Sequence, residues 1–369
     1  MENQGLIRKQ HVVSKFYLKG FADSSNRLRR IVLPGQKSHL ISAEKASVIS
    51  DFYTITLEDG QQTDYFERAF SRVEGPAAAV HKSIVENDHW PLRVGEKCDL
   101  ALWIALQHLR SQGMRTQGGN LKALIIQLMV GTSGKDALRR HIEEAEGQSI
   151  SNERLEFEWA ELTRPGGPRI KADPKEHLRV IRELLEPTAT MLGSMQWSLN
   201  VYRRKRLVTG DHPVRLLKNP GHPPYFGVGL ANAGGFAVPL SRRHGLVIGA
   251  SPDLPDLKVE GNALSAASIN QATVMNSRTV IYSHPDDEDV VNALHVPSPR
   301  EDEIAPTSIA GWVNEKGAFG HLSDEERDGL PAPIASDDDG QSFGLHDMAW
   351  PIPDRLHTWT EPEGKPDVE

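Results

Sequence analysis

The sequence predicts an α+β protein in which a helical middle packs on a mostly antiparallel sheet. Apolar residues recur every three or four positions across much of residues 64–195, which is typical of amphipathic or buried helices. Between residues 196 and 283, short runs of alternating apolar and polar residues lie between glycine- and proline-rich turns, as in antiparallel sheets. We therefore expect a single domain over residues 1–285, followed by a tail over residues 286–369.

The chain opens with an apolar and aromatic run, Val12 to Phe21, directly after His11. Such a run is unfavourable in water, so we expect this terminus to be docked into the core rather than frayed. Three segments that follow have the composition of short strands and end at turn signals such as Pro34-Gly35. These segments are residues 27–33, 39–41 and 49–56.

The helical middle contains one stretch that is apolar nearly all round, residues 97–112, which we expect to be a central buried helix. The other predicted helices cover residues 64–87, 120–130, 134–146, 152–162 and 175–195. Pro76 and Pro187 lie inside two of these helices. Because proline removes a backbone hydrogen bond, we expect a kink or a break just after Glu74 and a kinked or split helix at Pro187.

The later part of the chain is rich in strands. The predicted strands cover residues 197–201, 206–209, 226–230, 236–240, 246–250 and 279–283, with one helix at residues 264–275. This succession of short strands and turns favours an antiparallel sheet, against which the helical middle would pack.

Charge is distributed unevenly along the chain. From Pro297 onward there are 17 acidic and 5 basic residues, whereas residues 1–296 hold 33 acidic and 37 basic residues. The tail is also rich in proline, a composition that cannot bury enough apolar area to offset the entropy of ordering. We therefore expect an acidic, disordered tail that is dispensable for folding, attached to a mildly basic body.

Several classes of protein are excluded by what the sequence lacks. With one cysteine, Cys98, neither a disulfide within the chain nor a cysteine-based zinc site is possible. We found no phosphate-binding, dinucleotide-binding, serine-hydrolase or zinc-protease motif. The start has no signal-peptide pattern and no apolar stretch is long enough to span a membrane, so we expect a cytoplasmic protein.

Asp211 is the strongest local candidate for chemistry. It follows the predicted strand at residues 206–209 and stands in the segment Asp211-His212-Pro213, where polar groups can converge at the edge of a cleft. The aspartate would hold a divalent cation or act as a general base, and His212 would contact the substrate or relay a proton. The alternative is a turn, because aspartate before proline commonly caps nearby backbone amides.

A second candidate lies on the apolar helix, where Gln107 and Arg110 are three residues apart. A buried guanidinium needs an anionic partner, and Glu74 at the proline of the preceding helix is the natural one. The alternative is a structural pair that locks the two helices together. His11 is a third candidate, which would assist proton transfer if it meets Glu74 or Asp211 and would otherwise be an ordinary core histidine.

The fourth candidate is basic. Arg203, Arg204, Lys205 and Arg206 stand in a row between two predicted strands, and Arg242-Arg243 follow a later strand. Such residues can bind phosphate. The alternative is a solvated hairpin face, and without interleaved aromatic residues the pattern gives no support for sequence-specific reading of nucleic acid.

These motifs together resemble DUF4238, a domain of unknown function that is widespread in bacteria. Members look like His-x-Val-Pro-x-Phe-Tyr-Leu at the start, where this chain has Ser14 in place of proline, and Thr-Ser-Asp-Asn-Pro later, where it has His212 in place of asparagine. Matching segments include Arg72-Val73-Glu74 and Pro239-Leu240-Ser241. The resemblance covers about residues 10–285 and implies that the family pattern selects five polar positions, namely His11, Glu74, Arg110, Asp211 and Asn270. It implies no reaction.

The leading hypothesis is an intracellular hydrolase, cation-assisted and nuclease-like, that acts on a phosphate-bearing substrate such as nucleic acid or a nucleotide. His11, Glu74 and Asp211 would be catalytic, Asp211 would also hold the cation, and Arg110, His212 and Asn270 would bind substrate. The alternative is a non-catalytic binding module for nucleic acid or protein, in which the same polar set holds the fold and the basic residues hold the partner. Convergence in an open cleft would favour the enzyme, and burial with mutual hydrogen bonding would favour the binding module.

Overall fold

A computed structural model describes residues 6–35, 37–57, 59–165, 167–170, 172–222, 227–249 and 254–296, together with Val313, Glu315 and Gly317. These residues belong to two compact units. The larger unit contains the described residues up to Met114 and from Pro174 to residue 296. The smaller unit contains the described residues of Arg115–Asp173 and the three isolated residues.

The N-terminal run is docked into the core of the larger unit, as expected. Strand β1 (Lys9–His11) pairs with β4 (Val48–Ser50), and helix α1 (Lys15–Lys19) follows. Tyr17, Leu18 and Phe21 are wholly buried. Their burial places His11 and Ser14, which stand just before the helix, against the helical layer.

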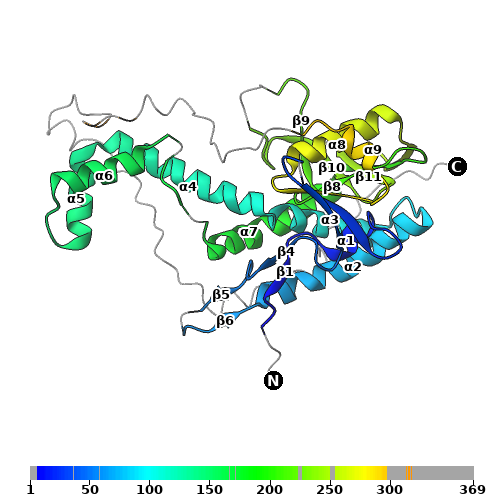
Figure 1. The fold of residues 1–369 in the computed structure, drawn as a ribbon, viewed down its shortest axis with the longest axis horizontal. Helices are drawn as coiled ribbons and strands as arrows, with labels where there is room; N and C mark the ends of the chain where they lie inside the picture. The colour runs from blue at the N-terminus through cyan, green and yellow to red at the C-terminus, as the bar shows by residue number, and fades with distance from the viewer. Residues whose placement is uncertain are drawn as a thin grey trace. The chain divides into compact units, whose positions relative to one another are not determined.

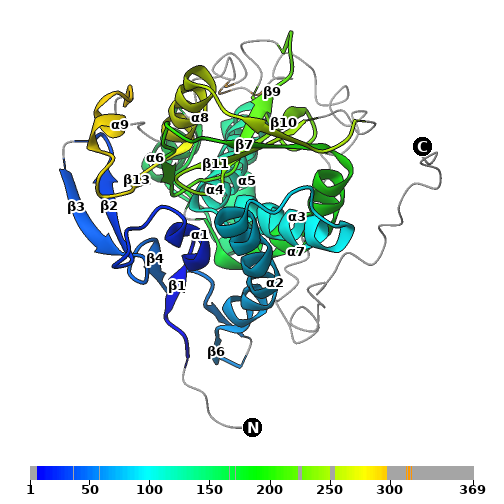
Figure 2. The same cartoon turned by 90° about the vertical axis from the view of Figure 1, so that its right-hand side faces the viewer.

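Three helices form that layer: α2 (Tyr65–Asn87), α3 (Val94–Leu109) and α7 (Pro174–Ser194). Figure 2 shows α3 and α7 side by side, with α2 beside α3. Helix α3 is the central buried helix that its all-round apolar sequence predicted, with Trp103 and Leu106 wholly buried.

The break expected after Glu74 and the split expected at Pro187 are wrong. Both α2 and α7 run without interruption through Pro76 and Pro187. Both prolines are exposed, as are Arg72 and Glu183 four residues earlier. The carbonyl groups that lose their amide partners can therefore bind water, which allows a helix to continue past a proline.

The strands of the larger unit form mostly antiparallel sheets within the described residues. One sheet has the order β12-β7-β11-β10-β9, in which only the β12–β7 pair is parallel, and another has the order β3-β2-β13-β8. The larger sheet consists of β7 (Gln196–Val201), β9 (Arg215–Lys218), β10 (Ala233–Pro239), β11 (His244–Gly249) and β12 (Leu257–Glu260). The other consists of β2 (Arg27–Val32), β3 (Lys37–Ser42), β8 (Thr209–Gly210) and β13 (Val280–Ser283). The short hairpin β5 (Ile55–Thr56) and β6 (Gln62–Thr63) stands apart.

Some strand predictions were wrong. Residues 227–230 are not a strand, and Phe226 lies outside the described residues, whereas β9 and β12 were missed. The sequence of β9 does not alternate, and β12 alternates over only four residues, so neither gives more than a weak strand signal. The strand expected at residues 206–209 is reduced to β8.

The smaller unit is helical. It contains most of α4 (Gln112–Ser133), followed by α5 (Lys135–Glu146) and α6 (Asn152–Thr163). Figure 1 shows α5 and α6 packed together beyond the end of α4. Its buried cluster is small and consists of Leu138, Ile150, Leu155 and Trp159.

The described structure continues past residue 285. Helix α8 (Ala263–Asn276) precedes β13, and α9 (Glu288–Asn292) follows it. Apart from residues 286–296 and the three residues of the smaller unit, the tail expected to be disordered lies outside the described residues. No helix within the described part of the chain is long and apolar enough to cross a membrane.

Candidate functional site

The first polar cluster forms around Arg110, at the end of α3. Its Nη2 donates to Glu74 Oε1 at 2.7 Å, Ser14 Oγ at 2.7 Å and Gln107 Oε1 at 3.1 Å. Arg110 is 1% exposed, whereas 24% of the Glu74 side chain is exposed. The predicted pairing of Arg110 with Glu74 is therefore confirmed, and Ser14 joins the N-terminal segment to it.

His11 lies at the edge of the Arg110 cluster and contacts Glu67, a carboxyl group that the sequence analysis missed. Its backbone amide donates to Glu67 Oε1 at 3.4 Å, and its Nε2 donates to the Glu44 carbonyl at 3.2 Å. Burial lowers the pKa of His11, and burial raises the pKa of Glu67 to about 7. Glu67 stands two helical turns before Glu74 on α2, so the spacing of these two glutamates was a signal that could have identified it.

Two atoms of the Arg110 cluster have no hydrogen-bond partner within the described residues. They are Glu67 Oε2 and Arg110 Nε, and both are buried. Buried polar atoms are nearly always hydrogen-bonded, so a water molecule would stabilise either atom, and a proton would stabilise Glu67 Oε2. A raised pKa of Glu67 fits this arrangement, because a neutral carboxyl group is less costly to leave partly unpaired.

Asp211 is not linked to this cluster by any hydrogen bond or ion pair of the described residues. Its Oδ1 accepts from the amide of Arg278 at 2.9 Å, and its Oδ2 accepts from the amide and hydroxyl of Thr279 at 2.7 and 2.6 Å and the amide of Val280 at 3.4 Å. The side chain therefore clamps the start of β13 to the end of β8. In the described residues no three His, Cys, Asp or Glu side chains are placed to hold a metal ion.

The side chains of His212 and Asn270 also form hydrogen bonds with backbone groups. The Nε2 of His212 accepts from the amide of Gly113 at 2.8 Å. Asn270, on α8, accepts from the amide of Val208 at 3.0 Å and donates to the carbonyl of Arg206 at 2.8 Å. Asn270 thereby fixes the backbone that leads out of the basic run.

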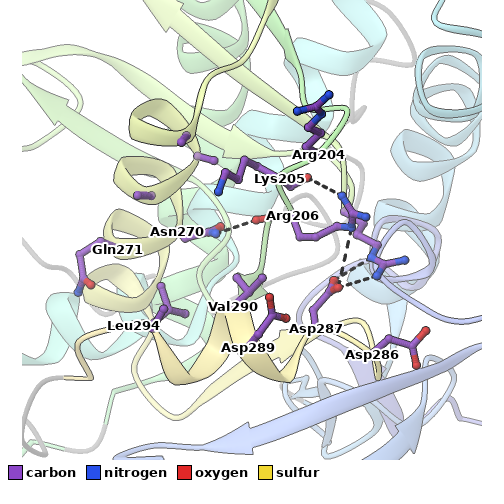
Figure 3. Close-up of a pocket in the computed structure, with 15 residues that line it drawn as sticks. Arg204, Lys205, Arg206, Asn270, Gln271, Asp286, Asp287, Asp289, Val290 and Leu294 are labelled. Atoms are coloured by element: carbon purple, nitrogen blue, oxygen red, sulfur yellow. Dashed lines mark hydrogen bonds and ion pairs between the residues drawn. The ribbon is translucent and has the colours of Figure 1, made fainter.

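That basic run lines a cavity of about 570 Å³, which we call the basic pocket. Arg204, Lys205, Arg206 and Arg242 supply its cations, and Asp286, Asp287 and Asp289 supply its acids (Figure 3). The apolar part of its wall comes from α8, from α9 and from the two residues after α9, and consists of Ala263, Ala266, Ala267, Val290, Ala293 and Leu294. The structure therefore brings residues of the two basic segments of the sequence together.

The cations of the basic pocket differ in their pairing. Arg242 binds Asp287 through two hydrogen bonds of 2.7 and 2.5 Å, and the Nε of Arg206 lies 4.0 Å from the same carboxylate. This hydrogen bonding raises the pKa of Arg242, whereas burial, together with Arg243 and Arg242, lowers the pKa of Arg206.

The two remaining cations are available to a ligand. Arg204 and Lys205 are exposed, and their side chains form no ion pair within the described residues. The sequence analysis missed the acids of the pocket because they fell in the segment assigned to the tail.

The fold and these contacts define an α+β protein whose buried polar residues join its elements and whose basic pocket is open to solvent. A family model described as "Protein of unknown function (DUF4238)" matches residues 9–287. The chain therefore belongs to the DUF4238 family, as the sequence motifs indicated. Neither the curated proteins nor the solved structures contain a match to it.

Proposed function

We propose that this protein binds a phosphate-bearing ligand of nucleotide size in the basic pocket, and that it acts as a binding module. The observation that carries the proposal is the pair of exposed cations, Arg204 and Lys205, that line a cavity with an apolar wall. A volume of about 570 Å³ is typical of small-molecule sites. Phosphate would lie against the cations, and the less polar part of the ligand would lie against α8 and α9.

The hydrogen bonds of Asp211, Arg110 and Asn270, three of the positions that the family pattern selects, support a binding module over an enzyme. The carboxylate of Asp211 accepts from four donors, and Nη2 of Arg110 donates to three acceptors. Asn270 uses its amide on the backbone. Groups that are buried and satisfied in this way stabilise a fold, and a substrate would have to displace these contacts before it could use them.

Calorimetric titration of adenosine monophosphate, with adenosine as the phosphate-free comparison, tests the proposal. The double variant Arg204→Ala, Lys205→Ala should weaken binding of the monophosphate at least about tenfold, because two cations are lost. Arg203→Ala is the matched control, since Arg203 is an exposed neighbour that does not line the basic pocket. Equal affinity for adenosine and its monophosphate, or equal losses in all variants, would contradict the proposal.

A second candidate, the hydrolase of the sequence analysis, is favoured by one specific observation. Glu67, with its pKa raised to about 7, belongs to the same cluster as Glu74, His11 and Arg110. A carboxyl group held neutral near a second carboxylate can act as a general acid. Hydrolysis of a nucleotide or an oligonucleotide, with and without Mn²⁺, would test this candidate. Turnover that Glu67→Gln and Glu74→Gln abolish, while Arg203→Ala leaves it intact, would replace the binding-module proposal.

A further inference from the structure

The corner between α4 and α5 exposes backbone groups that a helix leaves without partners. Helix α4 ends at Ser133 and α5 begins at Lys135, so a single residue, Gly134, separates them. The last carbonyls of one helix and the first amides of the next need partners from outside their own helix. Gly134 is the N-cap of α5 and has no side chain with which to cap it.

Glu315, from far along the chain, supplies hydrogen-bond partners for this corner. The carbonyl of Glu315 accepts from the amide of Lys135 at 2.8 Å, in the place where a capping side chain would act. The carboxylate of Glu315 also lies 3.1 Å from Lys135 Nζ, which in addition pairs with Glu156 at 2.7 Å. The backbone and the side chain of Glu315 thus bind the amide and the ammonium group of Lys135.

Gly317 packs against the other side of the corner because it has no side chain. Its φ is +81°, and a Cβ at this position would lie 2.9 Å from the carbonyl oxygens of both Thr132 and Ser133. Only glycine adopts this backbone conformation at low cost while approaching two backbone atoms so closely. The contact covers the last turn of α4, whose carbonyls have no further helical partners.

Val313 adds an apolar contact. It packs against the small buried cluster of Leu138, Ile150, Leu155 and Trp159. A unit with so few buried apolar residues gains little stability from its own core, so each added contact matters.

We infer that the α4–α5 corner is a docking site for Val313, Glu315 and Gly317 of this chain, and that these three residues form a clasp required for the stability of the helical unit. The site selects an apolar residue, an acidic residue two positions later and a glycine two positions after that. This inference differs from the expectation that the tail is dispensable for folding. It is independent of the proposed ligand of the basic pocket.

Hydrogen exchange of the full-length chain, followed at the amide of Lys135 and along α5 and α6, tests the clasp. Gly317→Ala should speed exchange at these positions at least about tenfold, because the added methyl group separates the clasp from the corner. Gly147→Ala is the matched control. Gly147 ends α5 with a φ of +68° and has nothing within 4 Å of its Cβ position, so this change introduces the same backbone strain without a clash.

Two truncated proteins distinguish loss of the clasp from a general loss of folding. A chain that ends after residue 320 should keep the protection of α5 and α6, and a chain that ends after residue 296 should lose it, while the exchange of α3 in both matches the full chain. Unchanged protection in the shorter chain, or equal effects of the two glycine variants, would overturn the inference. Protection that grows with protein concentration would also overturn it, because the clasp would then come from a neighbouring copy.

Discussion

Arg110 illustrates how one side chain joins distant parts of this fold. Its guanidinium contacts Ser14 from the N-terminal segment, Glu74 from α2 and Gln107 from α3. A buried cation needs this degree of hydrogen bonding, because unpaired burial of a charge is strongly unfavourable. The glutamate is more exposed than the arginine, so water reduces part of the interaction from that side.

Removal of one partner from this pair should destabilise the fold more than removal of both. We expect Glu74→Gln alone to lower the free energy of unfolding by roughly 3 kcal/mol, because the charge of Arg110 is left buried, and Arg110→Met alone to lower it by less, because Glu74 is partly exposed. The coupling energy from a double-mutant cycle, measured by urea unfolding, should be roughly 1–3 kcal/mol. A coupling energy near zero would mean that Ser14 and Gln107 alone hold Arg110.

Glu67 gives the fold a pH dependence of defined sign. Its pKa is about 7 in the folded protein against an ordinary value of 4.5, so the folded state holds a proton that the unfolded state releases in this window. Stability from this group is therefore fully present below pH 4.5 and is lost as the pH rises to about 7. We expect Glu67→Gln, compared with wild type, to gain up to about 3 kcal/mol in relative stability between these two pH values.

The measurement is urea unfolding of both proteins at several pH values across this window. Glu86→Gln, a change at an exposed glutamate on the same helix, controls for the loss of a charge. Parallel curves for Glu67→Gln and wild type would show that Glu67 is ionised like an ordinary surface glutamate.

Asp211 separates the two hypotheses that its sequence context left open. Its four hydrogen-bond donors indicate a clamp between β8 and β13, so Asp211→Asn should lower stability by roughly 1–3 kcal/mol. A role as a cation ligand stays a prediction of the sequence analysis. Calorimetric titration of Mn²⁺ into wild type and variant decides between them. Cation binding that the variant loses while its stability is unchanged would contradict the clamp.

Asp287, the N-cap residue of helix α9, places a carboxylate in the basic pocket, although α9 follows the last strand that the sequence predicted. Asp287 is buried, accepts two hydrogen bonds from Arg242 and forms a longer ion pair with Arg206. A phosphate that enters the pocket must therefore compete with an internal anion. We expect Asp287→Asn to tighten binding of the monophosphate by roughly tenfold, because one repelling charge is removed while the size of the side chain is kept. Weaker or unchanged binding would place the phosphate away from Arg206 and Arg242.

How far the sequence predicted each element depended on burial. Helix α3 and the pairing of Arg110 followed from an apolar helix that carries one cation, since burial dictates both the pattern and the need for a partner. Strand β12 was missed because its alternation of apolar and charged residues covers only four positions, the lower limit for a strand signal, and every residue in it is exposed. Asp287 was missed because tail-like composition hid a residue that only tertiary contacts identify as part of a pocket.

For the whole molecule, the chain links its two units more than once. It leaves the larger unit near Met114, returns near Pro174, and contributes residues 313, 315 and 317 to the smaller unit after the last described residues of the larger one. Residues 286–296 therefore belong to the larger unit, and residues 313, 315 and 317 belong to the smaller one. Non-local contacts of this kind leave no periodic signal in a sequence.

The central claim for the whole molecule is that the basic pocket receives phosphate. A crystal structure of the full chain grown with adenosine monophosphate tests this claim most directly. We predict phosphate oxygens within hydrogen-bond distance of Arg204 or Lys205, with the base against the apolar wall of α8 and α9. A ligand bound instead beside Glu67 and Glu74, or a basic pocket that stays empty at saturating ligand, would contradict the account.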